Sequence, residues 1–491
     1  MRIQIRALLF ASWLAAATGL GAQTITATPP APSGAEQAIQ DIKHPVDWLN
    51  WGGDFRLRNE YMDNSITLDG KTPLHEQDYF RLRARLWASV QPVTNLTLNT
   101  RLSGESRDWM DQSYARQYGV GRTGMEWRYG EVDNLNVRVA NLSGVPLTVT
   151  AGRQDVAFGD GWLVFDGTPG DGSWTLFLDS VRLTYEAKDI QTKFDVVLIQ
   201  QSALPDEWLP TIGDSSAKKT DGVRTPYYLT EQDERGVILY VSNKSLKNVQ
   251  LDGYFIYKND QRVHTDILPN GDNADIYTLG GKISGTPTKH WQYSMEGAYQ
   301  FGEKEDPMVK YPVNLSTMTR DISAYGGNAK LTYLFNDRFN NQASLIFEYL
   351  SGDDPKSKGT DEMFDILWGR WPRWSELYIY SYVNETGKKI AQLNNLMRVG
   401  PSWSITPAKN LTFTAMYNAL FAPEETPTRT VNPGLYSEGG NFRGHYLQAI
   451  LKYQFSKHVS AHAWSEFVFP GDFYTHSDTL MFLRGELMLT F

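Results

Sequence analysis

The feature that most constrains the fold is a regular alternation of polar and apolar side chains in several separate segments. In DYFRLRARLWASV, residues 78–90, arginines stand at every second position and Phe, Leu and Ala fill the positions between them. The segments GDFRLRNEY (53–61) and NLTLNTRLSGE (95–105) repeat this pattern. Because successive side chains of a strand point to opposite faces, a period of two predicts strands with one polar and one apolar face.

The connections between these segments alternate between short and long. QPVTN at 91–95 and SK at 456–457 are short turns, whereas 203–234 and 352–393 are long. This layout is typical of an outer-membrane barrel, in which periplasmic turns are short and extracellular loops are long. We therefore predict an all-β, transmembrane, antiparallel up-and-down barrel of about 18 strands, each close to the ~10 residues that cross a bilayer. A soluble β-sandwich or propeller is the alternative, but the sequence shows no blade-like repeat.

The two ends of the chain fit this prediction. Residues 1–22 have Arg2 and Arg6, an apolar stretch and small residues, which predicts a signal peptide cleaved after Gly21 or Ala22. The alternative, a retained membrane anchor, needs ~20 apolar residues, and this stretch is shorter. Residues 23–47 are rich in Ala, Pro and Thr, which favours a disordered periplasmic lead, and residues 48–491 are the predicted barrel. The final amphipathic segment, TLMFLRGELMLTF, ends on Phe491, which we expect the barrel assembly machinery to recognise.

Composition excludes several classes of function. The chain has no cysteine, so thiol catalysis, disulfides and Cys-based zinc sites are excluded. Lys and Arg number 47 against 56 Asp and Glu, and removal of the signal peptide with its two arginines makes the mature chain still more acidic. This balance argues against nucleic acid as a partner. We expect outer-membrane lipid around the barrel and no cofactor.

The polar face of the strands is rich in arginine. In a barrel of this width the polar face lines the water-filled interior. The alternation predicts that nine arginines point inward: Arg56, Arg58, Arg81, Arg83, Arg85, Arg101, Arg138, Arg153 and Arg182. Gly152 could mark a bulge that turns Arg153 aside.

Two interpretations of these arginines stay open. They either pair with interleaved carboxylates and stiffen the wall, or provide a positive field that draws anions through a pore. The carboxylates available for pairing are Asp54, Glu60, Glu105, Glu131, Asp155 and Glu186.

Several longer motifs resemble the alginate-export family of outer-membrane porins. They are WGGDFRLRNEY, YFRLRARL, AGRQDVAFGDGWLV, FLDSVRLTY, FDILWGRWPRWSELY and LNNLMRVGPSWSITPAKNLTF. The resemblance implies a monomeric barrel of eighteen strands that passes an anionic polysaccharide or oligosaccharide through an arginine-lined constriction. It points first to Arg153 and Arg182, then to Arg56, Arg58, Arg81 and Arg83. A general or small-organic-anion uptake porin is the second candidate.

No periplasmic turn is long enough to plug the pore, so we expect a long extracellular loop, 203–234 or 352–393, to fold inward. Trp368, Trp371 and Trp374 lie in the second of these loops, and packing or an interfacial belt is favoured over a platform for sugars.

Three other groups of residues have ordinary explanations. Asp160, Asp166 and Asp171 lie among glycines, but their spacing favours turn chemistry over a calcium site. His458, His462 and Glu466 share the polar face and are expected to be solvated, because two histidines four residues apart on a strand are ~13 Å apart and cannot share a metal ion. Ser460 is ~6.6 Å from either histidine along the strand, and no nucleophile motif occurs, so no enzymatic activity is expected.

Overall fold

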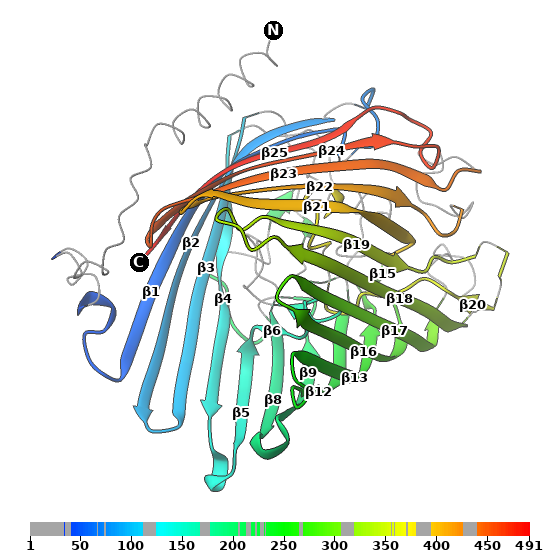
Figure 1. Cartoon of the computed structure of the whole chain (residues 1–491). Helices are drawn as coiled ribbons and strands as arrows, with labels where there is room; N and C mark the ends of the chain where they lie inside the picture. The colour runs from blue at the N-terminus through cyan, green and yellow to red at the C-terminus, as the bar shows by residue number, and fades with distance from the viewer. Residues whose placement is uncertain are drawn as a thin grey trace.

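A computed structural model describes most of the chain (Figure 1). The described residues are 34, 41–65, 67–72, 75–110, 124–166, 177–204, 207–212, 218–220, 223–225, 230, 232–264, 269–305, 319–354, 356–357, 359–369, 372–379, 394–425 and 439–491. The predicted signal peptide and most of the predicted periplasmic lead lie outside them. None of the described helices is long and apolar enough to cross a membrane.

Eighteen antiparallel strands form a closed barrel, in which each strand pairs with the next along the chain and β25 pairs with β1 (Figure 1). The barrel strands are β1 (Leu49–Asp63), β2 (Glu76–Val93), β3 (Leu96–Trp109), β4 (Gly124–Val139), β5 (Leu147–Gln154), β8 (Leu178–Ala187), β9 (Thr192–Gln201), β12 (Asp233–Asn243), β13 (Val249–Gln261), β16 (Ala274–Thr288), β17 (Trp291–Glu305), β18 (Thr319–Leu334), β19 (Gln342–Leu350), β21 (Leu396–Ala408), β22 (Leu411–Phe421), β23 (Phe442–Ser456), β24 (Val459–Pro470) and β25 (Leu480–Thr490). The predicted fold and strand number are confirmed.

Short elements lie in the connections. The two 3-10 helices, η1 (Leu142–Gly144) and η2 (Lys188–Ile190), are in periplasmic turns. The extracellular connections hold β6 (Val156–Ala157), β7 (Phe165–Asp166), β10 (Lys218–Thr220), β11 (Val223–Thr225), β14 (Val263–His264), β15 (Pro269–Asn270) and β20 (Thr360–Asp361). β20 pairs with β18 in parallel, so it is not a wall strand.

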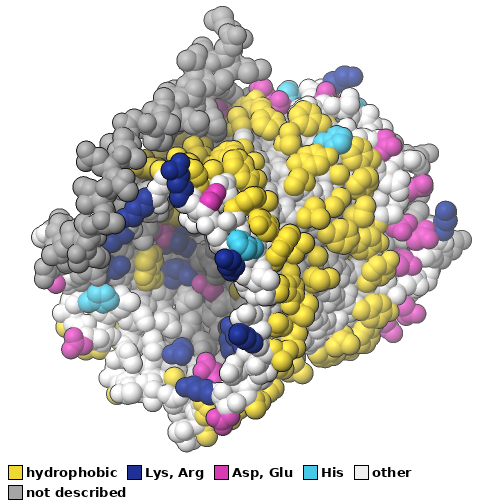
Figure 2. Space-filling view, viewed as in Figure 1, with side chains coloured by type: hydrophobic (Ala, Val, Ile, Leu, Met, Phe, Trp, Pro, Cys, Tyr) yellow, Lys and Arg dark blue, Asp and Glu magenta, His cyan; other side chains and the backbone are white. Residues whose placement is uncertain are grey.

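The alternation in the sequence is the alternation of faces in the barrel. Phe55 is 42% exposed on the outside, whereas its neighbour Arg56 is 1% exposed on the inside. Figure 2 shows the resulting outer band of hydrophobic side chains, and Lys and Arg side chains in the hollow beside it. Such a band suits a lipid environment, and a polar interior suits water.

The seam between the first and last strands is tied at its periplasmic end by Phe491. The Phe491 amide donates to the Gly53 carbonyl at 3.0 Å, and the ring of Phe491 packs edge-on against Trp51 at 5.7 Å. The end of the chain is therefore part of the closed wall.

Two extracellular loops fold into the barrel. Residues 156–166 follow β5, and the described residues of 351–379, which are 351–354, 356–357, 359–369 and 372–379, follow β19. The two segments meet where Val164 forms a parallel bridge with Trp368, and the ring of Trp162 stacks on Phe364 at 5.4 Å. The expectation of an inward loop is confirmed for 352–393 in its described part, and the loop after β5 adds to it. In the other candidate loop, 203–234, Ile212 forms a bridge with Gly130 of β4, and Trp208 Nε1 donates to Asp179 at 2.7 Å.

Gly152 does not mark a bulge, because β5 pairs with both neighbours in continuous register. Its φ of 121° is in the region that favours glycine, and an added Cβ would overlap the Leu135 carbonyl oxygen. The glycine lets β5 approach β4 closely, and Arg153 keeps its inward direction, 1% exposed.

Candidate functional site

Three neighbouring strands present more arginines than carboxylates to the interior. The inward positions of β1, β2 and β3 carry three carboxylates, Asp54, Glu60 and Glu105, and seven arginines. We call these seven arginines the arginine wall: Arg56, Arg58, Arg81, Arg83, Arg85, Arg101 and Arg107. The register places Arg56 opposite Arg83 and Arg58 opposite Arg81, so like charges face each other across the β1–β2 pair. Such pairs are unfavourable unless carboxylates lie beside them.

Carboxylates lie between these arginines. Asp54 accepts from Arg83 at 3.2 Å and from Arg85 Nε at 2.7 Å. Glu105 contacts Arg81 at 3.3 Å and Arg107 at 2.9 Å. Each carboxylate thus serves two guanidinium groups, which is how the wall packs its charges despite the unequal numbers.

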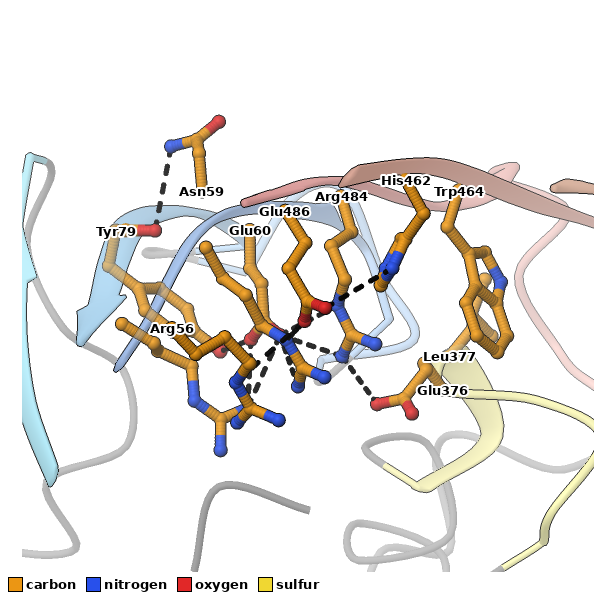
Figure 3. A network of polar contacts seen from close by, with 12 residues as sticks. Arg56, Asn59, Glu60, Tyr79, Glu376, Leu377, His462, Trp464, Arg484 and Glu486 are labelled. Atoms are coloured by element: carbon orange, nitrogen blue, oxygen red, sulfur yellow. Dashed lines mark hydrogen bonds and ion pairs between the residues drawn. The ribbon is translucent and has the colours of Figure 1, made fainter. Parts of the chain in front are cut away.

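Glu60 is fully buried and joins the wall to an inward loop (Figure 3). Its carboxylate accepts from Arg81 at 3.0 Å, Tyr79 at 2.9 Å and Arg484 of β25 at 2.7 Å. Arg484 also donates to Glu376 of the 351–379 loop at 2.7 Å. A buried charge that is paired and hydrogen-bonded in this way fixes the position of its partners.

Glu486 of β25 is a second carboxylate centre beside the wall. It contacts Arg58 directly, Arg56 at 3.7 Å and His462 Nδ1 at 3.4 Å (Figure 3). The His462 side chain is only 11% exposed, so the expectation of a solvated histidine is wrong here. His458 lies in the turn just before β24, where its Nδ1 is 2.8 Å from the Thr490 carbonyl oxygen.

The arginines extend beyond the wall along β5 and β8. Arg101 bridges Asp133 at 2.7 Å and Asp155 at 2.8 Å. Arg153 forms a forked pair with Asp179, with distances of 2.9 and 3.1 Å, and lies 3.6 Å from the centre of the Phe177 ring.

The last predicted arginines lie toward the periplasmic half. Arg182 pairs with Asp195 at 2.9 Å, and Arg138 is exposed near the end of β4. All nine predicted arginines therefore lie in one continuous arc of strands, β1 to β8, and most of them have carboxylate partners.

The opposite side of the barrel has a different balance. The inward positions of β12, β13, β16 and β17 carry three lysines, Lys258, Lys282 and Lys304, and four carboxylates, Glu234, Asp252, Asp260 and Glu296. No arginine occupies an inward position of these four strands. The inward positions of β1–β3 therefore carry an excess of positive charge, and those of β12, β13, β16 and β17 do not.

The inward loops contact both sides of the interior. Trp368 is fully buried and donates from Nε1 to Glu234 at 2.9 Å, which confirms loop packing for this tryptophan. Asp160 is only partly covered and pairs with Lys282 at 2.7 Å. This partial burial alone would raise the pKa of Asp160, but the hydrogen bond and charge of Lys282 lower the pKa below its ordinary value. These contacts tie the loops to β12 and β16.

At the other side, Glu466 holds the 351–379 loop against β23–β25. It is fully buried, and it accepts from Ser375 Oγ, the amides of Glu376 and Leu377, and Trp464 Nε1, at 2.5, 2.9, 3.1 and 2.6 Å. The expectation that Glu466 is solvated is therefore wrong, because the loop covers it.

Some predicted sites fall partly outside the described residues. Trp371 and Asp171 are not described, nor is the side chain of Asp166. In the part of the chain that the structure describes, no group of His, Asp and Glu side chains is arranged to hold a metal ion. Six further residues were not predicted as part of the site: Arg107, Asp133, Asp179, Asp195, Arg484 and Glu486. The alternation places Arg107, Asp195, Arg484 and Glu486 inside, but Asp133 faces inward because the β3–β4 register shifts beside it.

Comparison with known proteins agrees with this geometry. Residues 47–480 match a family model described as alginate export. OccAB1 of Acinetobacter baumannii has a TM-score of 0.55 at 10% identity, over 90% of this chain and 96% of that one. OpdK, an outer-membrane protein of Pseudomonas aeruginosa, has a TM-score of 0.52 at 8% identity, over 90% and 98%. A search of curated proteins gives no match. At these identities the solved structures support the barrel fold alone.

Proposed function

Because the chain belongs to the alginate export family, we propose that this outer-membrane channel passes carboxylate-bearing polysaccharides or oligosaccharides along its arginine wall by passive diffusion. The observation that carries the proposal is the charge balance of β1–β3, whose inward positions hold seven arginines and three carboxylates. Three further carboxylates that pair with these arginines, Asp133, Asp155 and Glu486, lie on or beside the neighbouring strands. A local excess of one sign in a narrow interior concentrates solutes of the opposite sign.

Arginine suits carboxylates for a geometric reason. The planar guanidinium binds a carboxylate through two parallel hydrogen bonds, as Arg153 does with Asp179. A uronate chain carries a carboxylate on every sugar, so closely spaced guanidinium groups can pass it from one to the next. The wall carboxylates keep each contact weak enough to be exchanged, because they compete for the same donors.

The alternative interpretation is a wall of structural ion pairs. The pairs of Asp54, Glu60 and Glu105 support it, because each of them binds two arginines. Sharing does not cancel the charge, however: even with Asp133, Asp155 and Glu486 counted, the seven wall arginines meet six carboxylates. A small-organic-anion porin would use the same excess, so the length of the solute must be tested as well as its charge.

The test uses Arg85 and Arg182, whose side chains are 15% and 20% exposed and lie at separate points of the arc. Reversal potentials and block by galacturonate oligomers are measured in planar bilayers. The R85Q/R182Q protein should lose anion selectivity and bind the oligomers about tenfold more weakly, since it lacks two solvent-screened ion pairs, each contributing up to about 1 kcal/mol. The matched R85K/R182K protein keeps the charge, so it should retain the selectivity.

Neutral maltose oligomers of the same length are the control for size, and monomeric galacturonate tests the small-anion alternative. Block that strengthens with the length of the uronate supports a polymer channel, and equal effects of monomer and hexamer support the small-anion porin. A pore that is indifferent to ion charge, or is unchanged in R85Q/R182Q, would mean that the arginines only stiffen the wall.

A further inference from the structure

The periplasmic rim of the barrel is basic although the whole chain is acidic. The turns at this rim contain two acidic residues, Asp189 and Asp337, and seven basic ones. We call these seven the basic rim, and all are exposed: Lys188, Lys244, Lys247, Lys289, Arg338, Lys409 and Lys457. They come from six successive turns, from β8–β9 to β23–β24, so they cover an unbroken arc.

The other rim has the opposite sign. Apart from the connections that hold the two inward loops, the described side chains of the extracellular connections include seven Asp and Glu against two Lys and Arg. The two ends of the barrel therefore differ in charge, with an excess of basic residues at the periplasmic end and of acidic residues at the extracellular end. Figure 2 shows acidic side chains along one margin of the hydrophobic band and basic side chains along the other.

Aromatic side chains on the outer face lie directly beside the basic rim. Trp291 is 40% exposed, Phe335 is 49% exposed and Phe455 is 53% exposed. Trp291 and Phe335 both contact Tyr333, at 4.9 and 5.0 Å, and Phe455 contacts Tyr453 at 4.6 Å. Exposed aromatic side chains at the end of a barrel's apolar band mark the level of the lipid headgroups.

The basic residues of the rim and the exposed aromatic side chains are close together in the sequence. Lys289 is two residues before Trp291, Arg338 is three after Phe335, and Lys457 is two after Phe455. The long stem of a lysine or arginine lets its charge reach the headgroups while its carbons lie on apolar surface. The basic rim is therefore at the height of the phospholipid headgroups.

Apolar side chains lie among the rim charges. Leu246, between Lys244 and Lys247, is 53% exposed, and Ile190, beside Lys188, is 55% exposed. A soluble polyanion would satisfy the lysines but leave these side chains in water. An anionic lipid satisfies both kinds of group.

We propose that the basic rim binds the headgroups of anionic phospholipids in the periplasmic leaflet of the outer membrane, and so holds the barrel at a fixed depth with a shell enriched in these lipids. The proposal does not depend on which solute the channel passes. The attraction between the exposed basic side chains and the lipid phosphates is electrostatic, so salt should weaken the binding.

The test compares phosphatidylglycerol with phosphatidylcholine in nanodiscs that contain equal amounts of both. Native mass spectrometry of protein released from the discs counts the retained lipids. We expect phosphatidylglycerol to be retained about tenfold over phosphatidylcholine, and 0.5 M NaCl in the equilibration to reduce this ratio.

A matched pair of variants locates the effect. K244Q/K247Q removes two charges from the basic rim, and K71Q/K356Q removes two exposed lysines from the extracellular side. The ratio should fall several-fold in the first variant and stay unchanged in the second, while both keep the wild-type melting temperature in pure phosphatidylcholine. The proposal is overturned by equal retention of the two lipids, by equal loss in both variants, or by a K244Q/K247Q protein that changes only the rate of uronate block.

Discussion

Glu466 allows a direct measurement of how firmly the 351–379 loop is held in the barrel. Its Oε2 accepts from Ser375 Oγ and the Leu377 amide, and its Oε1 accepts from the Glu376 amide and Trp464 Nε1. In Glu466→Gln one oxygen becomes an NH2 group that faces donors. With the NH2 at the Oε1 position, the Glu376 amide and Trp464 Nε1 lose their acceptor; with the NH2 at the Oε2 position, the Leu377 amide loses its acceptor, while Ser375 Oγ can turn to accept from the NH2.

The magnitude follows from these contacts. A hydrogen bond to a charged acceptor contributes about 1.5–3 kcal/mol, and a buried N–H without an acceptor costs about 1–3 kcal/mol. In either orientation one backbone amide of the loop, that of Glu376 or that of Leu377, loses its acceptor. We therefore expect the docked loop to be weakened by about 3 kcal/mol, which raises the population of the released loop about a hundredfold.

The lack of cysteine in the chain makes the assay clean. Leu377 is fully buried, so a thiol at L377C reacts with a maleimide only when the loop is released. The reaction rate should rise about a hundredfold when Glu466→Gln is added. Glu362→Gln is the control, because that carboxylate accepts from Ser357 in the same loop. Equal rates with and without Glu466→Gln, in folded protein, would refute the view that Glu466 anchors the loop.

Three further predictions concern the loops and β5. As the pH falls through the lowered pKa of Asp160, protonation removes the attraction of this carboxylate to Lys282, and the stabilisation of the loop present at neutral pH is lost. Current noise in single-channel records should therefore grow at acid pH. In Asp160→Asn the noise should be independent of pH. Gly152→Ala should lower the stability by about 3 kcal/mol, measured as the melting temperature, whereas Gly253→Ala, which has open space around the new methyl group, should change it little. Trp368→Ala should cost about 3–5 kcal/mol of loop packing and increase the conductance, and an unchanged conductance would contradict its role in filling the interior.

The barrel was predictable because its signals are local. The alternation around Arg81, Arg83 and Arg85 fixes which face is inside, and the alternation of turns and loops fixes the topology. Strand ends, inward arginines and the absence of a long periplasmic turn all follow from segments of fewer than about 20 residues. The same local signals favoured packing or an interfacial belt for Trp368 over a platform for sugars, and the structure shows packing.

The partners of the inward charges were not predictable. Arg484 and Glu60 are 424 residues apart in the chain, and Glu466 is 91 residues from Ser375. Only the closure of the barrel and the path of the loop bring these groups together. The alternation placed His458, His462 and Glu466 on the correct face. It could not show that the 351–379 loop covers Glu466, so these side chains were expected to contact water.

The charges at the seam also select the way in which the barrel closes. In the observed register Arg58 lies opposite Glu486, and Glu60 lies opposite Arg484. A slip of one residue would turn every inward side chain of β1 toward the outside relative to β25. A slip of two residues keeps the faces, but in one direction it places Arg58 opposite Arg484, and in the other it places Glu60 opposite Glu486. Either error sets like charges against each other in the interior, so four side chains at the first and last strands specify the stagger of the strands and with it the width of the finished barrel.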